Sequence, residues 1–252
     1  MTHDIVKQDL IGDSAKMATE YSRLDALGLK SPYALGVMKK VTKYSSTILK
    51  PYLKEPILEV GPADGIVTEE IISAGFFPVL LEGSKPLCES LLKKFPDTEV
   101  IHSLFEDFIP LKNFNTIVMG HVLEHVEDPA SLIAHAYKLL LNGGAVWAAV
   151  PNALSIHRQA AVKMGILKNV YELNATDINV GHRRVFDMKT LCEIFDSSGF
   201  EIEKSGGYFL KPISNSQIEE TWTEKMVDAF LELGNGMPEV SGEIWVLARK
   251  KA

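Results

Sequence analysis

The stretch 56–71, PILEVGPADGIVTEEI, decides the fold of this 252-residue chain. Residues 56–60 form an apolar run typical of a buried parallel strand, and a helical pattern begins at Ile66. The turn between them runs from Gly61 to Gly65, and glycine there can adopt a positive φ and let a ligand approach the backbone closely. The helix start adds free N–H donors beside the turn. The stretch therefore predicts a strand, a glycine turn and a helix that together bind a polar, nucleotide-like ligand.

The spacing within the turn narrows the class of ligand. The run 59–65, EVGPADG, does not fit the G-x-G-x-x-G fingerprint of dinucleotide-binding dehydrogenases. It resembles the cofactor loop of class I S-adenosylmethionine-dependent methyltransferases, E/D-x-G-x-G-x-G, with Ala63 in place of the middle glycine. A second acid, Glu82, ends the strand predicted over 78–81 and lies about 20 residues past the first glycine, the distance at which an acid reaches ribose hydroxyls.

The resemblance implies that S-adenosyl-L-methionine is the cofactor. It also implies that Glu82 binds the ribose of this methyl donor. The other residues that it places at this part of the cofactor site are Glu59, Gly61, Ala63, Gly65 and Gly83.

The run 114–129, FNTIVMGHVLEHVEDP, is the second segment that carries the resemblance. It is similar to the F-D-x-I-V…V-L-E-H-V-x-D-P signature of a large class I subgroup that methylates small molecules, with Asn115 in place of the usual Asp. The pieces LNGG at 141–144 and VPN at 150–152 follow the same family pattern. The resemblance places at the donor site the residues Gly120, His121 and His125.

His121 is the residue that we expect nearest to the transferred methyl group. It lies at the carboxyl end of a predicted central strand, where open α/β sheets bind ligands, and an imidazole there can exchange a proton near neutral pH. We predict that His121 is the proton acceptor or the polar orienter, with His182 as the competing candidate. Alternatively, His121 and His125 only cap or brace the loop.

The run 103–108, SLFEDF, follows the third predicted strand, where the family holds the adenine. In the family an acid takes the exocyclic amine, a backbone N–H meets a ring nitrogen and an apolar side chain covers the ring face. Here Ser103 or Leu104 stands in the usual acidic slot, so the amine contact would pass to Glu106 or the acid after it. Phe105 is the expected cover of the adenine. The alternative is that both phenylalanines of the run are core residues.

Strands and crossover helices alternate from 56 to 150, which predicts an α/β protein with a doubly wound, mostly parallel sheet. Two further strands, over 201–210 and 243–249, flank a helix predicted near 216–233. They resemble the antiparallel edge of the family's seven-stranded, Rossmann-like fold.

Two segments are predicted to cover the site. Residues 1–54 show helical spacing over 14–27 and 31–49 and no convincing strand. The resemblance implies that these helices fold as a lid over a Rossmann-like methyltransferase domain, 55–252. The insertion 153–185 follows the fifth strand and is predicted as a second lid, since long loops within compact domains are usually functional.

The acceptor is expected between these segments. Tyr21, Tyr33 and Tyr44 would face the pocket or, alternatively, only pack the helices. The insertion gathers arginines and histidines in a chain of net negative charge, which predicts an anionic group on the substrate. Alternatively, His182 and Arg183 tie the insertion down through backbone carbonyls. The predicted substrate-binding residues are Tyr21, His157, Arg158, His182 and Arg183.

Composition limits the partners and the compartment. A net charge of −7 disfavours nucleic acid as a partner, because phosphates would be repelled. Cys88 and Cys192 have no metal-ligand spacing around them, so no metal site is predicted, and a reducing cytoplasm fits two free thiols. No signal peptide is expected, because the first 14 residues contain no apolar core of the required length, and no stretch approaches membrane-spanning length. The expected partner is a small-molecule acceptor, with a homodimer as a possible assembly.

The predicted function is methyl transfer from S-adenosylmethionine to an oxygen or nitrogen atom of a small, anionic metabolite or sugar-related molecule. One rival is a regulatory partner that binds S-adenosylmethionine without catalysis, since the loop and Glu82 predict only that the donor binds. A nucleotide-sugar or NAD-dependent oxidoreductase is a second rival, and the spacing of the loop disfavours it.

Overall fold

The structure is a computed structural model, and it describes residues 6–7, 14–28 and 36–251. The stretch 56–71 forms β2 (Ile57–Val60), a glycine turn and α3 (Ile66–Ser73), as the sequence predicts. All four residues of β2 are buried, because helices cover both faces of the sheet at this strand.

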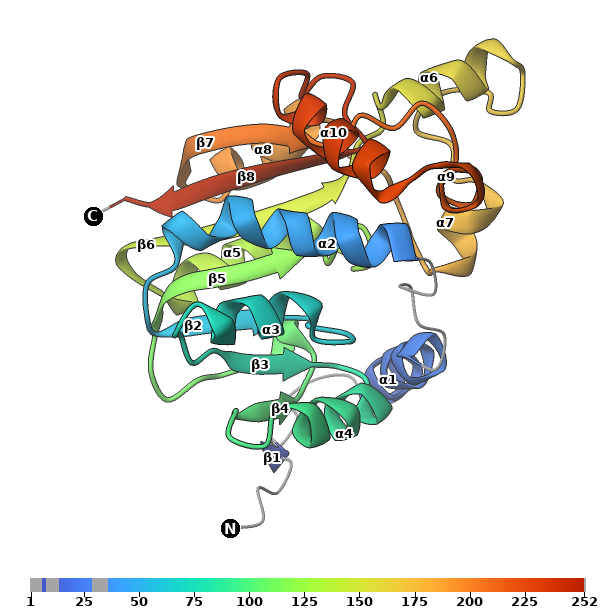
Figure 1. Ribbon diagram of the computed structural model, residues 1–252. Helices are drawn as coiled ribbons and strands as arrows, with labels where there is room; N and C mark the ends of the chain where they lie inside the picture. The colour runs from blue at the N-terminus through green and yellow to red at the C-terminus, as the bar shows by residue number, and fades with distance from the viewer. Residues whose placement is uncertain (1–5, 8–13, 29–35, 252) are drawn as a thin grey trace.

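One mixed sheet carries the fold. Its other strands are β1 (Val6–Lys7), β3 (Val79–Glu82), β4 (Val100–His102), β5 (Phe114–Gly120), β6 (Leu140–Pro151), β7 (Phe200–Tyr208) and β8 (Glu243–Lys250). The strands lie in the order β1-β4-β3-β2-β5-β6-β8-β7 (Figure 1). Neighbours from β1 to β6 are parallel, whereas β8 pairs antiparallel with both β6 and β7. The doubly wound, mostly parallel sheet with an antiparallel edge is thereby confirmed.

Helices form a layer on each face of the sheet. One layer packs α2, α3, α9 and α10 against the sheet, and the other packs α5 and α8 (Figure 1). Near the β4 edge, α1 lies beside α4. The bounds of these helices are α1 (Ser14–Gly28), α2 (Gly36–Leu49), α4 (Lys85–Lys94), α5 (Pro129–Leu139), α8 (Met188–Ser197), α9 (Asn215–Thr221) and α10 (Glu224–Asn235). The segment after β6 holds two shorter helices, α6 (Ile156–Lys163) and α7 (Ala175–Asn179).

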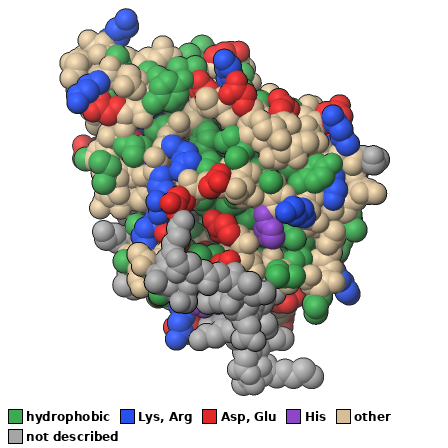
Figure 2. All heavy atoms as spheres, turned by 180° about the vertical axis from the view of Figure 1, so that it is seen from behind, with side chains coloured by type: hydrophobic (Ala, Val, Ile, Leu, Met, Phe, Trp, Pro, Cys, Tyr) green, Lys and Arg blue, Asp and Glu red, His purple; other side chains and the backbone are tan. Residues whose placement is uncertain are grey.

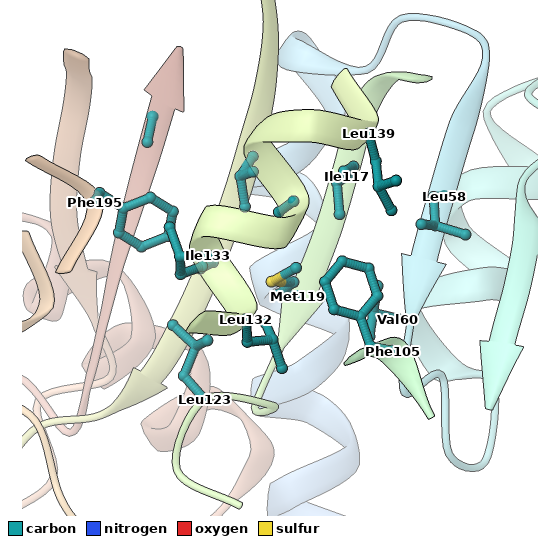
Figure 3. Packing of buried hydrophobic residues seen from close by; sticks show 14 of the residues in the cluster. Leu58, Val60, Phe105, Ile117, Met119, Leu123, Leu132, Ile133, Leu139 and Phe195 are labelled. Atoms are coloured by element: carbon teal, nitrogen blue, oxygen red, sulfur yellow. The ribbon is translucent and has the colours of Figure 1, made fainter. Parts of the chain in front are cut away.

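The core follows from the alternation of side chains along the central strands. In β5, Ile117 and Met119 point into the cluster that includes Leu132 and Phe195 of α5 and α8 (Figure 3). Val118, between them, belongs to the cluster on the opposite face. Each central strand therefore fixes both helix layers, and its carboxyl end is held rigidly at one edge of the sheet.

Two details differ from the sequence prediction. The described residues add an eighth strand, because Val6–Lys7 pairs with β4, whereas no strand was expected within 1–54. Two residues are too few for any alternation to reveal a strand. The helix predicted near 216–233 is instead the pair α9 and α10, because Trp222 has an extended backbone with ψ 142° and the side chain of Thr223 caps α10.

Some predictions lie outside the described residues. These are the position of Tyr33 and the start of the helix predicted over 31–49, which the structure describes from Gly36. The domain boundary at residue 54 stays a prediction. Within the described part of the chain, no helix combines the length and apolar character required to cross a membrane.

Candidate active site

A cavity of about 560 Å³ opens at the carboxyl ends of the parallel strands. The chain leaves β2 toward β3 and leaves β5 in the opposite direction, toward β6, so the strand order switches between these two neighbours. Open α/β sheets bind ligands outside such a switch point. The residues at the ends of β2 to β6 that line the cavity include Gly61, Glu82, Ser103, His121 and Asn152. This cavity is the candidate active site.

The glycine turn lines the cavity through Gly61 and Ala63. Gly61, Ala63 and Gly65 all have positive φ, at 62°, 50° and 71°. A Cβ on Gly65 would lie 2.5 Å from Cε2 of Phe95, so this glycine packs against the end of α4 and lies outside the cavity lining. A side chain on Gly61 would approach Val122 to 3.2 Å. Gly61 therefore keeps the turn open to a ligand, and Gly65 shapes it from behind.

Glu82 joins the turn to the end of β3. Its Oε2 accepts a hydrogen bond from the Ala63 N–H at 3.2 Å, and its Oε1 accepts one from the Ser84 N–H at 2.8 Å. Burial raises the pKa of Glu82 to about 6, although these backbone donors oppose the rise. Each carboxylate oxygen has a second acceptor position, so Glu82 can still receive a ligand's hydroxyl groups. The placement fits the predicted ribose contact.

Glu59 lies beneath the turn rather than in the cavity. It is buried and accepts a hydrogen bond of 2.7 Å from the Thr68 hydroxyl, which connects β2 to α3. Burial raises the pKa of Glu59 to about 7. The structure thus gives Glu59 the position of a brace for the loop.

The run after β4 lines the cavity with Leu104, Phe105 and Glu106. Phe105 is 5% exposed and belongs to the core cluster, in edge contact with His135, as the alternative interpretation expected. The N–H of Leu104, a candidate for a ring nitrogen of adenine, donates a 3.1 Å hydrogen bond to the hydroxyl of Tyr21. Tyr21 itself does not line the cavity. It was predicted at the acceptor, but α1 instead places it against the run 103–108 that follows β4.

His121 directly follows β5 and lies within a cluster of buried acids. Its φ of 57° is uncommon for a residue other than glycine, and such backbone strain recurs at functional sites. Nδ1 lies 3.1 Å from Oε1 of Glu124, and Nε2 lies 3.8 Å from Oε2 of Glu243. Burial opposes protonation, but the hydrogen bond with Glu124 and the charge of Glu243 raise the pKa of His121 to about 9. In this arrangement the imidazole is protonated at neutral pH, which suits orientation better than proton acceptance.

The insertion reaches the cavity through α6, α7 and the loop that follows α7. Arg158 is 3% exposed and donates from one guanidinium nitrogen to Asp177 at 2.9 Å and from another to the Val170 carbonyl at 2.9 Å. A third nitrogen bonds the Glu172 carbonyl. Arg158 thus holds the insertion together from within, although its side chain also borders the cavity. His182 lies beside the same acid, with Nδ1 3.3 Å from Asp177 Oδ1.

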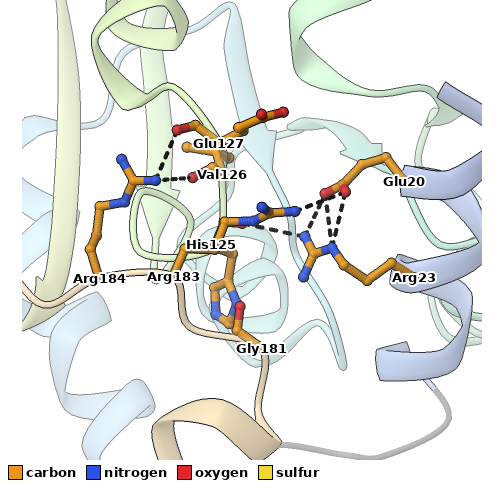
Figure 4. A network of polar contacts seen from close by, with 8 residues as sticks. All are labelled: Glu20, Arg23, His125, Val126, Glu127, Gly181, Arg183 and Arg184. Atoms are coloured by element: carbon orange, nitrogen blue, oxygen red, sulfur yellow. Dashed lines mark hydrogen bonds and ion pairs between the residues drawn. The ribbon is translucent and has the colours of Figure 1, made fainter. Parts of the chain in front are cut away.

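Arg183 and Arg184 fasten the insertion to the loop after β5 (Figure 4). Arg183 donates to the His125 carbonyl at 2.9 Å and pairs with Glu20 of α1 at 3.1 Å. Arg184 donates to the carbonyls of Val126 and Glu127 at 2.9 Å and 2.8 Å. The alternative interpretation was that His182 and Arg183 tie the insertion down through backbone carbonyls. The position of Arg183 agrees with it, since Arg183 donates to the His125 carbonyl.

Lys211 and Glu243 are among the charged residues of the cavity that the sequence did not reveal. Lys211 is buried between β7 and α9 and donates a 2.9 Å hydrogen bond to the side-chain oxygen of Asn215, a neutral partner. Glu243, at the start of β8, is 4% exposed and faces His121. Burial lowers the pKa of Lys211 and raises that of Glu243. Neither residue lies in a recognisable sequence motif. They reach the site only because β8 pairs between β6 and β7 in the sheet.

The cavity unites most of the residues predicted from the sequence. Those that line it are Gly61, Ala63, Glu82, Gly83, Leu104, Phe105, Glu106, Gly120, His121, His125, His157, Arg158 and His182. Those outside its lining are Tyr21, Glu59, Gly65 and Arg183. On the face seen in Figure 2, described acidic and basic side chains are interspersed, and they form no broad basic surface.

Comparison with known proteins identifies the family. The model of a methyltransferase domain matches residues 34–205, well over half of the chain. A probable S-adenosylmethionine-dependent methyltransferase of Mycolicibacterium smegmatis is 22% identical over 154 residues, which are 61% of this chain and 54% of that protein. The chain thus spans about half the length of this relative. It belongs to the methyltransferase-domain family, in agreement with the family predicted from the sequence.

Solved methyltransferase structures share the fold. A possible histamine N-methyltransferase of Thermotoga maritima is 18% identical with a TM-score of 0.58, covering 94% of this chain and 97% of its own. The N-methyltransferase NodS of Bradyrhizobium japonicum, solved with S-adenosyl-L-homocysteine, is 13% identical with a TM-score of 0.57, covering 94% and 99%. At these identities the likeness concerns the fold alone, and it supports the Rossmann-like methyltransferase architecture.

Proposed function

We propose that this methyltransferase transfers the methyl group of S-adenosyl-L-methionine to an oxygen or nitrogen atom of a small, anionic metabolite or sugar-related molecule. The family and the relatives named S-adenosylmethionine-dependent support the donor. The observation that carries the proposal is a single cavity that combines the glycine turn and Glu82 with His121 and Lys211. Donor and acceptor would thus share one enclosure.

The donor occupies the half of the cavity formed by the ends of β2, β3 and β4. Glu82 receives the ribose hydroxyls, Gly61 and Ala63 allow close approach along the backbone, and the run after β4 holds the adenine beside Leu104. The sulfonium of the donor is already a strong electrophile. The protein has chiefly to align the acceptor with the methyl group and to exclude water.

The acceptor occupies the half formed by β5, the insertion and the C-terminal loops. The guanidinium groups of Arg158 and Arg183 are engaged with carboxylates and carbonyls of the chain itself. In the described part of the chain, the one side-chain hydrogen bond of Lys211 goes to the amide oxygen of Asn215, while the charges of Glu243 and Asp177 act on it from nearby. Because this lysine lines the cavity, we assign the anionic group of the acceptor to it. His121 is proposed to orient the acceptor beside the methyl group, with His182 as the second candidate.

Two segments serve as the cover in this proposal. Leu24 of α1 packs closely over Gly83, since a Cβ added to Gly83 would lie 2.5 Å from the Leu24 side chain. Tyr21, also of α1, accepts a hydrogen bond from the Leu104 N–H in the run after β4. The ion pair of Glu20 with Arg183 joins α1 to the insertion. Closure of both segments over bound substrates would exclude water from the reaction.

The test uses S-adenosylmethionine with an isotopically labelled methyl group and a small-molecule extract divided by anion exchange. The proposal predicts that label enters low-mass compounds of the retained fractions and that Lys211→Met loses this transfer while Lys211→Arg keeps part of it. Transfer confined to uncharged compounds would contradict the anionic acceptor. Donor binding without transfer to any fraction would favour the rival function, a regulatory protein that binds the donor without catalysis. A homodimer remains a prediction, which light scattering checks.

A further inference from the structure

We propose that Glu124, His125 and His182 form a binding site for a divalent transition-metal ion at the acceptor end of the cavity. One candidate ligand atom from each of these residues lies within 4.8 Å of the others. Both histidines line the cavity. The inference deepens the proposed function, on which it depends only for the role of the ion.

The three side chains converge from two distant parts of the sequence. Glu124 and His125 belong to the loop after β5, and His182 follows α7 in the insertion. The N–H of Arg183 donates to the Glu124 carbonyl at 2.8 Å, so a backbone contact holds the two segments together. Ligands bound at about 2.0–2.2 Å from one ion are roughly 3–3.5 Å apart, and small side-chain rotations would close the present separations to that range.

Two of the three candidate ligands, His125 and Glu124, have a hydrogen-bond partner that orients them. Nδ1 of His125 lies 3.3 Å from the Gly181 carbonyl, a bond that leaves Nε2 available to an ion. Nδ1 of His182 lies 3.3 Å from Oδ1 of Asp177, within ion-pair distance, but makes no hydrogen bond among the described residues. Oε1 of Glu124 is bonded to His121 at 3.1 Å. Histidines that ligate metals nearly always have such a carbonyl or carboxylate on the second nitrogen, because it fixes the tautomer and the ring.

A buried oxygen without a partner is the independent observation that points to a ligand. Glu124 is 0% exposed, and its Oε2 makes no hydrogen bond among the described residues. A buried carboxylate oxygen is costly unless a donor or a cation satisfies it. His121 accounts for Oε1 only. A cation between Oε2 and the two imidazoles would satisfy the remaining oxygen.

The ligand set selects the kind of ion. Two imidazoles and one carboxylate suit Zn²⁺, Fe²⁺, Co²⁺ or Mn²⁺, whereas Mg²⁺ and Ca²⁺ prefer all-oxygen sites. Three protein ligands leave at least one coordination position open, the arrangement of catalytic rather than structural sites. Because the histidines line the cavity, the open position would hold an oxygen of the acceptor, and the ion would lower the pKa of an acceptor hydroxyl. No metal site was expected from the sequence, because the cysteines have no metal-ligand spacing, no cluster of acids typical of a magnesium site occurs, and His182 lies far along the chain from Glu124 and His125.

The experiment measures metal binding directly on the full chain. Protein stripped with a chelator is titrated with Zn²⁺, Co²⁺ and Mg²⁺ by calorimetry, and the Co²⁺ complex is followed by its visible absorption. We expect about one ion per chain, with Zn²⁺ and Co²⁺ bound at least about 100-fold more tightly than Mg²⁺. Glu124→Gln and His182→Asn should each weaken Zn²⁺ binding by about 100-fold or more, because each removes one of three ligands.

The control is His157→Asn, which changes another histidine of the same cavity, outside the ligand group. It should leave Zn²⁺ affinity within about threefold of the unaltered chain, since no ligand is lost. Circular dichroism shows whether each variant is folded. The site would be disproved if the unaltered chain bound Zn²⁺ no better than the Glu124→Gln and His182→Asn double variant, or if His157→Asn lost as much affinity. Metal binding without methyl transfer would overturn the proposed function alone, and full transfer by a metal-free, chelator-treated chain would overturn the role of the ion alone.

Discussion

Glu82 and Glu59 are two buried acids on neighbouring strands that the structure assigns to different tasks. Glu82 lines the cavity and has capacity to accept ribose hydroxyls, whereas Glu59 bonds Thr68 beneath the turn. The same substitution, Glu to Gln, keeps the size of each side chain and removes its charge. It therefore compares an acid that lines the cavity and also accepts two backbone N–H groups with an acid that only supports the loop.

For Glu82→Gln we expect S-adenosylmethionine to bind about 10–100-fold more weakly at pH 8. A hydrogen bond to a charged group contributes roughly 1.5–3 kcal/mol, and a factor of ten is about 1.4 kcal/mol. The glutamine keeps one acceptor oxygen, so the lower part of the range applies if a single ribose hydroxyl is held. Glu59→Gln should change the affinity by less than about threefold, because it has no contact with the cavity.

The assay is calorimetric titration of S-adenosylmethionine into the unaltered chain and both variants. In the unaltered chain the affinity should also fall as the pH drops below about 6, where Glu82 becomes protonated. The assignment of Glu82 to the ribose is refuted if Glu82→Gln binds the donor normally. Equal losses in the two variants would show that loop support, not ribose contact, is what both acids provide.

Three further predictions concern stability and turnover. Gly65→Ala should destabilise the fold by at least about 1 kcal/mol more than Gly165→Ala, as measured by urea unfolding. Both glycines have similar positive φ values, 71° and 73°, but only a Cβ at residue 65 would collide with Phe95. Equal losses of stability in the two variants would contradict this prediction. Glu59 has a pKa of about 7 in the folded chain, against an ordinary value of 4.5. Its ionisation therefore lowers the free energy of unfolding as the pH rises from about 4.5 to 7, by at most about 3 kcal/mol. Glu59→Gln should make the free energy of unfolding depend less on pH over that range. His121→Ala should lower kcat and leave the affinity for the donor nearly unchanged. The loss of kcat should be about 10²–10⁴-fold if the imidazole accepts the proton, and smaller if it only orients the acceptor. Full turnover by this variant would exclude both roles.

The parts of the site that the sequence predicted are those encoded locally. The glycine turn, the acid that ends β3 and the histidine that ends β5 each follow directly from a strand, and a parallel sheet gathers the carboxyl ends of its strands at one edge. Their neighbours in space are therefore implied by the order of the strands. This is why Gly61, Glu82 and His121 could be placed together before the structure was known.

The partners of side chains in the insertion could not be predicted in the same way. Whether Arg158 binds the methyl acceptor or pairs with Asp177 depends on how α6 and α7 fold back on each other. Lys211 and Glu243 reach the cavity only because β8 inserts antiparallel between β6 and β7. Local sequence patterns do not predict such long-range contacts. The approach of His182 to Glu124 could not be predicted for the same reason.

The proposed function depends above all on the binding of S-adenosylmethionine in the cavity as a methyl donor. The most direct measurement titrates the chain in separate calorimetric experiments with S-adenosylmethionine, S-adenosylhomocysteine and NAD. The account predicts that the first two bind at about one molecule per chain and that NAD does not bind, since the turn lacks the dinucleotide spacing. Binding of NAD with no binding of S-adenosylmethionine would contradict it.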